Sequence, residues 1–175
     1  MYRFVPLKSL RVALSVKRGI AALAVVALGS PAFGATTTQT FTTQITITAS
    51  CTILSASLLD FGTQGVLTAN VDQTSTIQVQ CTDTTPFNIG LDAGTSAGAT
   101  VTTRKMTSGG GATVDYALYS DSGHTTNWGN TVSTDTVSST GTGAAQSFQV
   151  FGRVPPQTTP APALYTDTVT VTVTY

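Results

Sequence analysis

The chain has 175 residues, with eight Lys or Arg, eight acidic residues and a formal net charge of zero. That balance does not hold along the chain, because five of the basic residues lie within the first 18 positions and every acid is an Asp beyond residue 34. Residues 35–175 therefore have three basic residues against eight Asp, a net charge of −5, which disfavours nucleic acid and anionic lipid as partners.

Residues 1–34 have the pattern of an export signal. A basic front is followed by an apolar run at 20–28, and Ala32 and Gly34 supply the small residues that precede a cleavage site. The apolar run is too short for a membrane anchor, which needs about 20 apolar residues. We expect cleavage after Gly34, and the remaining 141 residues are enough for one domain with its own core.

The composition beyond residue 34 predicts an all-β protein. Thr is abundant, followed by Gly, Ser and Val, whereas Glu is absent and Lys and Arg are scarce. Thr and Val suit pleated sheets, and the missing residues are those that usually cover helix surfaces. No stretch has a convincing 3.6-residue period, so we expect a two-sheet sandwich of six to eight short strands.

The expected elements follow one another with turn signals between them. In chain order they are a polar lead-in at 35–40 and strands at 41–53, 58–62, 74–82, 86–92, 97–106, 114–119, 148–152 and 165–175. Residues 120–144 are rich in Ser, Thr, Gly and Asn and predict a long surface connection. In the final strand, Val169, Val171, Val173 and Tyr175 alternate with Thr, and we expect no strand to follow it.

The two cysteines, Cys51 and Cys81, are expected to form a disulfide. Exported proteins with two cysteines usually pair them, and both lie near the ends of predicted strands. Free buried thiols and a metal site are the alternatives, but two cysteines and one distant His cannot complete a zinc shell. We expect no metal and no cofactor.

Residue types that serve catalysis or ligand binding in other proteins form no recognisable motif in this chain. His124, the single His, lies in a polar turn and is expected to be solvated, without the G-x-S-x-G motif of a hydrolase. Trp128, with Tyr116, Tyr119 and Tyr165, could form a carbohydrate platform, although core packing is the better interpretation. Arg104 and Arg153 could each anchor a partner, form a structural salt bridge or be exposed. We therefore predict no enzyme and no small-molecule substrate.

An ordered set of short motifs resembles the spore coat protein U domain family over residues 41–175. The motifs are Cys51-Thr-Ile53, Leu59-Asp-Phe61-Gly62, Val79-Gln-Cys81, Leu91-Asp-Ala-Gly94, Arg104-Lys-Met106, Tyr116-Ala-Leu-Tyr119, Trp128-Gly129, Phe151-Gly-Arg-Val154 and Tyr165-Thr-Asp167. This family is similar to subunits of archaic chaperone–usher pili of the Csu type. The resemblance implies an incomplete immunoglobulin-like β-sandwich that a donated strand completes.

The resemblance also implies a division of the chain and a role for each part. Residues 35–50 would be an N-terminal extension that donates a strand, and residues 51–175 the sandwich domain. The residues expected to face inward in the donated strand are Phe41, Thr43, Ile45, Ile47 and Ala49, and those of the acceptor-groove strand are Val169, Val171, Val173 and Tyr175. The alternative is that 41–53 is simply the first strand of the domain itself.

The function that follows from the resemblance is structural. We expect a subunit of a secreted chaperone–usher fimbria that supports adhesion or biofilm formation, with neighbouring pilus subunits, a periplasmic chaperone and an outer-membrane usher as partners. The chain would be exported to the periplasm and then displayed at the cell surface or in an extracellular fimbrium. A secreted tip adhesin or carbohydrate-binding module is the alternative.

Overall fold

The computed structural model describes residues 34–175, so the predicted export signal at 1–34 lies outside the described residues except for Gly34. No helix occurs in residues 34–175, and hence none there could span a membrane. The strands are β1 (Cys51–Ala56), β2 (Val71–Cys81), β3 (Pro86–Leu91), β4 (Arg104–Thr107), β5 (Thr113–Tyr119), β6 (Val137–Thr140), β7 (Ala145–Val154) and β8 (Val171–Thr174). The predicted all-β class is confirmed.

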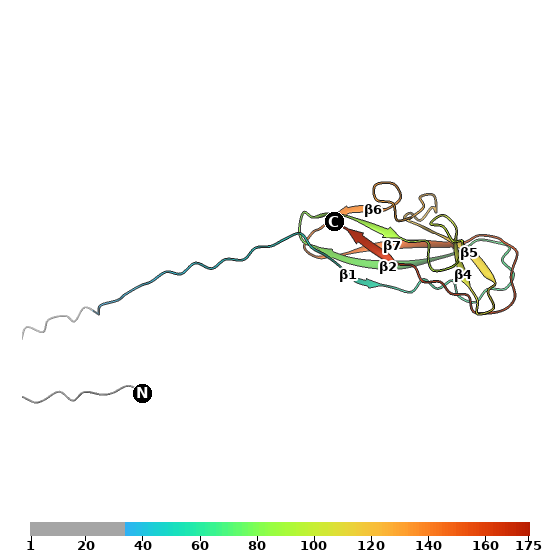
Figure 1. The fold of residues 1–175 in the computed structure, drawn as a ribbon, viewed down its shortest axis with the longest axis horizontal. Helices are drawn as coiled ribbons and strands as arrows, with labels where there is room; N and C mark the ends of the chain where they lie inside the picture. Colours follow the sequence, from blue (N-terminus) through green and yellow to red (C-terminus); the bar gives the residue numbers. More distant parts are fainter. Residues whose placement is uncertain (1–33) are drawn as a thin grey trace, which may run out of the picture. The chain divides into compact units, whose positions relative to one another are not determined.

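The strands form two antiparallel sheets within residues 44–175. One has five strands in the order β1-β2-β7-β5-β4, and the other has three in the order β6-β3-β8 (Figure 1). β2 and β7 form the longest pairing, with Val71 opposite Val154 and Gln80 opposite Ala145. The predicted two-sheet sandwich is therefore present, and β1 and β8 each stand at the edge of a different sheet.

The core is built from alternate residues of the central strands. In β2, Ile77, Val79 and Cys81 are buried, while their neighbours in sequence are partly or wholly exposed. This is the period of two that a strand with one covered face requires. Trp128 is also buried, and its indole Nε1 donates to the Ile89 carbonyl at 2.8 Å. Burial of Trp128 and Tyr116 confirms core packing for these two aromatic residues.

Several predicted bounds are wrong, and local side-chain chemistry explains two of them. Residues 58–62 form a turn instead of a strand, because the Asp60 carboxylate accepts from the Gly62 amide and Gly62 has a φ of 70°. The terminal strand is limited to β8, because the Asp167 carboxylate accepts from the Thr95 and Thr168 amides and takes them out of strand pairing.

The first strand begins only at Cys51, since residues 34–50 form no strand. β4 occupies only part of predicted strand 97–106, and β6 lies inside the predicted connection at 120–144.

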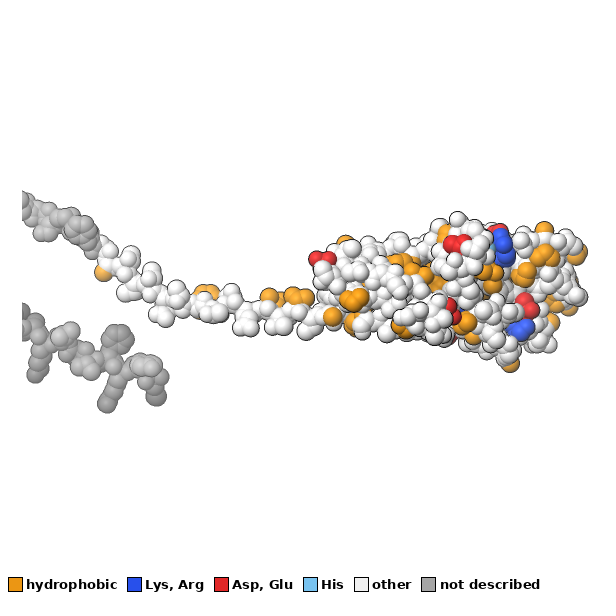
Figure 2. Space-filling model, turned by 90° about the horizontal axis from the view of Figure 1, so that it is seen from above, with side chains coloured by type: hydrophobic (Ala, Val, Ile, Leu, Met, Phe, Trp, Pro, Cys, Tyr) orange, Lys and Arg blue, Asp and Glu red, His pale blue; other side chains and the backbone are white. Residues whose placement is uncertain are grey.

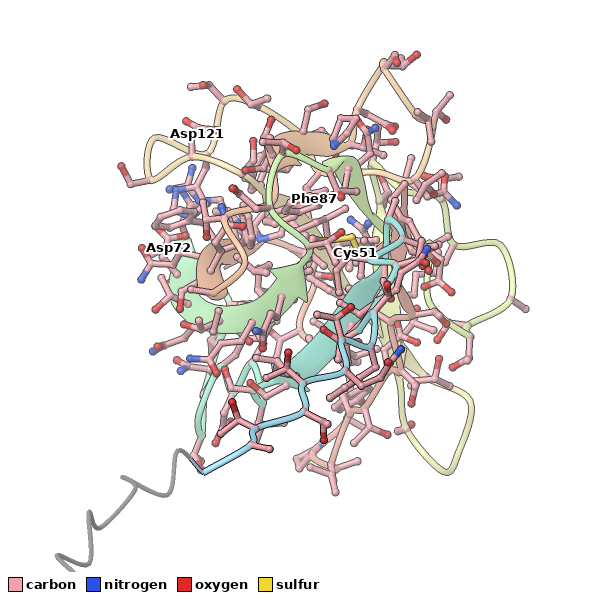
Figure 3. The ribbon with its side chains drawn as sticks, turned by 90° about the vertical axis from the view of Figure 1, so that its left-hand side faces the viewer. Cys51, Asp72, Phe87 and Asp121 are labelled. Atoms are coloured by element: carbon pink, nitrogen blue, oxygen red, sulfur yellow. A yellow bond between two sulfur atoms is a disulfide. The ribbon has the colours of Figure 1, made fainter. Side chains whose placement is uncertain are left out.

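Cys51 and Cys81 form the predicted disulfide, which joins the first residue of β1 to the last residue of β2. The two residues are opposite each other in the β1–β2 register. Figure 3 looks onto this end of the sandwich, where the yellow bond lies beside the label of Cys51. The bridge secures an edge strand that has a hydrogen-bonded partner on one side only.

Arg104 is neither exposed nor paired with a carboxylate, contrary to two of the three alternatives for it. Its side chain is fully buried, and its guanidinium donates to the carbonyls of Leu91, Asp92, Val101 and Trp128 at 2.7–2.9 Å. Leu91 ends β3 in one sheet, whereas Arg104 begins β4 in the other. One cation therefore ties the two sheets together at the end of the sandwich opposite the disulfide.

His124 is likewise not the solvated residue that the sequence predicts. Its side chain is only 8% exposed and packs edge-on against Tyr119 and Phe151. The His124 Nδ1 lies 3.1 Å from Arg153 Nη2, and Arg153 in turn forms a 2.7 Å salt bridge with Asp72. This hydrogen-bonded pairing lowers the pKa of Asp72. Asp121 belongs to the loop that carries His124. In Figure 3 the labels of Asp121 and Asp72 both lie on the left side of the molecule.

Loss of the disulfide should reduce stability without changing the fold. The bridge closes a loop across a sequence separation of 30 residues. Restriction of the unfolded chain by a loop of this size is worth about 3–4 kcal/mol. We therefore expect Cys51→Ser combined with Cys81→Ser to lower the free energy of unfolding by about that amount in urea titrations. An unchanged midpoint would show that the bridge adds nothing to stability.

Replacement of Arg104 should be far more harmful than replacement of its neighbour. Arg104→Met leaves four carbonyls without their donor, two of them in fully buried hydrogen bonds, so we expect a loss of about 3 kcal/mol or more in the free energy of unfolding. Lys105→Met is the matched control, because Lys105 forms a partly exposed salt bridge with Asp115 that should be worth at most about 1 kcal/mol. Equal losses for the two variants would contradict this role of Arg104.

Candidate functional site

The strands β1 and β8 flank an open side of the sandwich. Each is the last strand of its sheet, so the outer edge of each has no neighbouring strand in residues 34–175. The β1 arrow points away from the end where the C-terminus lies, and the β8 arrow points towards it (Figure 1). Two antiparallel edges with unpaired backbone groups thus face one gap, the kind of surface that natural proteins normally cover.

A cavity of about 1000 Å³ opens beside these edges, where Ala56 at the end of β1 and Val171 at the start of β8 line it. Its walls come from the segment after β1 and from the segment that leads into β8, and core residues such as Ile77, Leu118 and Val150 form its floor. The cavity therefore gives access to the hydrophobic core itself. Figure 2 shows how few charged side chains the molecule carries on the face in view.

The exposure of β1 supports the same conclusion. Ile53 and Leu54 are neighbours in β1 where its register with β2 shifts at a β-bulge, and their side chains are 39% and 46% exposed. Leu58, in the segment that follows, is 82% exposed at the rim of the cavity.

The predicted acceptor residues border this cavity to different degrees. Val169 and Val171 line it, and together with Val173 they are partly buried against the core. Tyr175 is 60% exposed. Val171 and Val173 lie in β8, opposite Leu91 and Ile89 of β3, which positions their side chains over the core.

The predicted donor residues are not part of any strand in the single chain. Phe41, Ile45 and Ile47 are 86%, 83% and 72% exposed, and Thr43 and Ala49 are also exposed. None of the residues 44–50 lines the large cavity. This stretch thus has large, regularly spaced apolar side chains without a covering partner.

Two carboxylates fix the segment that leads into β8, and sequence reasoning did not identify either. Asp167 accepts from the Tyr116 hydroxyl at 2.8 Å, and burial together with this bond raises the pKa of Tyr116. Asp92 accepts from the amides of Thr170 and Gly94; burial opposes its charge, but these bonds lower its pKa. The motifs Leu91-Asp-Ala-Gly94 and Tyr165-Thr-Asp167 contain the two residues, which is the signal that could have identified them.

The wall of the cavity depends on a close approach at Gly152 in β7. A Cβ atom there would lie 2.6 Å from Leu59 Cδ2 and 3.0 Å from Phe61 Cζ, both on the segment that follows β1. A side chain at position 152 would therefore require the ends of the Leu59 and Phe61 side chains to shift. In residues 34–175, no three His, Cys or Asp side chains gather where they could hold a metal ion.

The comparisons with known proteins agree with this geometry. The family model of the Spore Coat Protein U domain matches residues 37–172. The chain is also similar to a chain in the crystal structure of the CsuC–CsuE chaperone–tip adhesion subunit pre-assembly complex, from archaic chaperone–usher Csu pili of Acinetobacter baumannii. The TM-score is 0.54 at 27% sequence identity, and the match covers 74% of this chain but only 40% of that one. None of the curated proteins matches.

A side chain at position 152 should disturb the cavity wall. We expect Gly152→Ala to displace Leu59 and Phe61 and to lower the free energy of unfolding by about 1–3 kcal/mol, measured by thermal or urea denaturation. Gly65→Ala is the control in the same wall, because a Cβ there meets nothing within 4 Å. If both variants unfold like the parent chain, the close approach at Gly152 has no energetic importance.

Proposed function

The chain belongs to the Spore Coat Protein U domain family, and we propose that it is a structural subunit of a Csu-type chaperone–usher pilus, not an enzyme. In this proposal the extension 35–50 of one copy enters the groove between β1 and β8 of the next copy and completes its sandwich. The observation that carries the proposal is the open apolar cavity beside two unpaired edge strands.

A donated strand would both pair with the free strand edges of the groove and fill its apolar cavity. Its backbone would pair with the free edges of β1 and β8, and its alternate side chains would enter the cavity, as in β-augmentation. The extension has the required alternation at Phe41, Ile45 and Ile47. Burial of each large side chain is worth about 1.5–3 kcal/mol before the cost of ordering the extension.

The directions of the strands favour a linear polymer. The extension leaves the sandwich at Cys51, beside the 82–85 turn, and β8 ends near the same pole because Thr174 pairs with Asn88 just after that turn. An incoming strand antiparallel to β8 runs away from this pole, so its own domain follows at the opposite pole. Each copy then receives at one end and donates at the other, which is a heterologous contact that repeats without closing.

The same groove also suggests which proteins bind the subunit before it joins a fibre. The similar crystal structure is a complex with a chaperone, and we propose that a periplasmic chaperone covers this groove until a neighbouring subunit replaces it at an outer-membrane usher. Export through the predicted signal at 1–34 and display at the cell surface or in an extracellular fimbrium belong to this proposal. The start of β1 at Cys51 supports the division into extension 35–50 and domain 51–175.

We favour a structural role in the fibre, for adhesion or biofilm formation, over a tip adhesin or carbohydrate-binding module. Trp128 and Tyr116, which could have formed an aromatic platform for a sugar, are buried. Specific glycan binding by the purified protein would favour the alternative.

A charge on the inward face of the extension should stop assembly. We expect Ile45→Asp to abolish polymerisation, since a carboxylate would have to enter an apolar cavity, while chaperone binding stays intact. Fibres can be followed by electron microscopy and by size-exclusion chromatography after co-expression with chaperone and usher.

Thr46→Asp is the matched control, because residue 46 is the outward-facing neighbour and its charge would remain in water. That variant should polymerise like the parent chain. Fibre formation by Ile45→Asp, or its loss in both variants alike, would rule out the inward set proposed above.

A further inference from the structure

We propose that the chain is built so that its extension cannot enter its own groove and is therefore committed to a second copy. This inference rests on the function proposed above and concerns which copy supplies the strand. It follows from three features: the way the chain enters β1, the hydrogen bonds at Ser50, and the residues that are missing from 35–59.

Entry into its own groove would require the chain to reverse directly before β1. β1 runs away from the disulfide pole, and the groove lies along its outer edge. An extension that folded back would therefore form a hairpin with β1.

Ser50 is not free to take part in such a turn. Its carbonyl accepts from the Thr82 amide at 2.9 Å, and its own amide donates to Thr82 Oγ1 at 3.1 Å. These bonds continue the pairing of β1 with β2 by one residue beyond the disulfide. The reversal would have to occur at or before Ala49, and residues 47–49 already lie against the 82–86 turn.

Residues 35–59 contain no residue that favours a tight turn. Gly, Pro, Asn and Asp are all absent from this stretch, which also has no charged residue. Hairpin turns depend on these residue types because their central positions need a positive φ. Five of the positive-φ residues in 34–175 are Gly, among them Gly94 and Gly143. The other three are Thr84, His124 and Ser133, and Thr84 follows an Asp whose carboxylate accepts from the Thr84 amide.

A turn at 47–49 would also use up residues that the groove needs. Ile47 and Ala49 belong to the predicted inward set, so a chain that closed on itself could offer only Phe41, Thr43 and Ile45. Ile47 and Thr48 are β-branched, and such residues adopt a positive φ only with strain. A second copy can present all five positions without any turn.

The test is to give the extension the turn that it lacks. Gly-Asn-Gly-Ser inserted between Ala49 and Ser50 should allow the extension to reach its own groove. The matched control is an insert of equal length, Thr-Gln-Thr-Thr, which lengthens the extension without adding a turn residue. Each full-length mature chain is refolded with its disulfide oxidised, and its mass is measured by light scattering.

We expect the parent chain and the Thr-rich variant to form multimers and the Gly-rich variant to remain a closed monomer. A flexible tether gives its own segment a millimolar effective concentration, so at a micromolar concentration of chain, closed monomers should exceed multimers by about a thousandfold. Amide exchange at Val171 and Val173 should slow in that monomer. If the Gly-rich variant forms multimers like the parent, or if the parent refolds as a closed monomer, the inference is wrong.

A second arm separates this inference from the function on which it rests. A synthetic peptide of residues 35–50 is added to the Ile45→Asp chain, whose own extension is disabled. Binding of the peptide supports the groove as a strand acceptor, and if the Gly-rich variant still forms multimers, only the block to self-closure is wrong. If the peptide does not bind, the proposed function fails and this inference fails with it.

Discussion

Two edge strands without a strand between them determine the rest of this structure. β1 and β8 belong to different sheets, and the gap between them exposes backbone hydrogen-bonding groups and the floor of the core at once. Polar backbone groups and apolar side chains are both costly to leave uncovered, so a single occupant must satisfy both. An extended segment with alternate apolar residues meets these two requirements together, and the extension at 35–50 is the segment that we propose for this role.

Contacts in the rest of the sandwich hold the segments on either side of this gap in place. The disulfide holds the start of β1, while Asp92 and Asp167 fix the segment before β8 through backbone amides on both sides. Arg104 ties the end of β3 to β4 through four carbonyls. Leu91, Asp167 and Thr168 also line the cavity, so part of this frame is the cavity wall itself.

Much of this architecture could be predicted from sequence, and the failures have physical reasons. Alternation identifies the buried face of β2 and β8, and two cysteines in an exported chain identify the disulfide. Alternation does not reveal whether a partner strand exists, and this is why 41–50 seemed to continue β1. Side-chain turns such as the one at Asp60 interrupt strands wherever a carboxylate can reach an amide. The burial of Arg104 and His124 depends on distant carbonyls and rings that no local pattern shows.

The absence of charge from residues 35–59 would affect how the proposed fibre responds to dissolved salt. A joint formed by apolar burial and backbone pairing contains no ion pair from this segment that salt could screen, and salting-out anions strengthen apolar contacts instead. Joints of this kind would therefore not weaken as the ionic strength outside the cell rises.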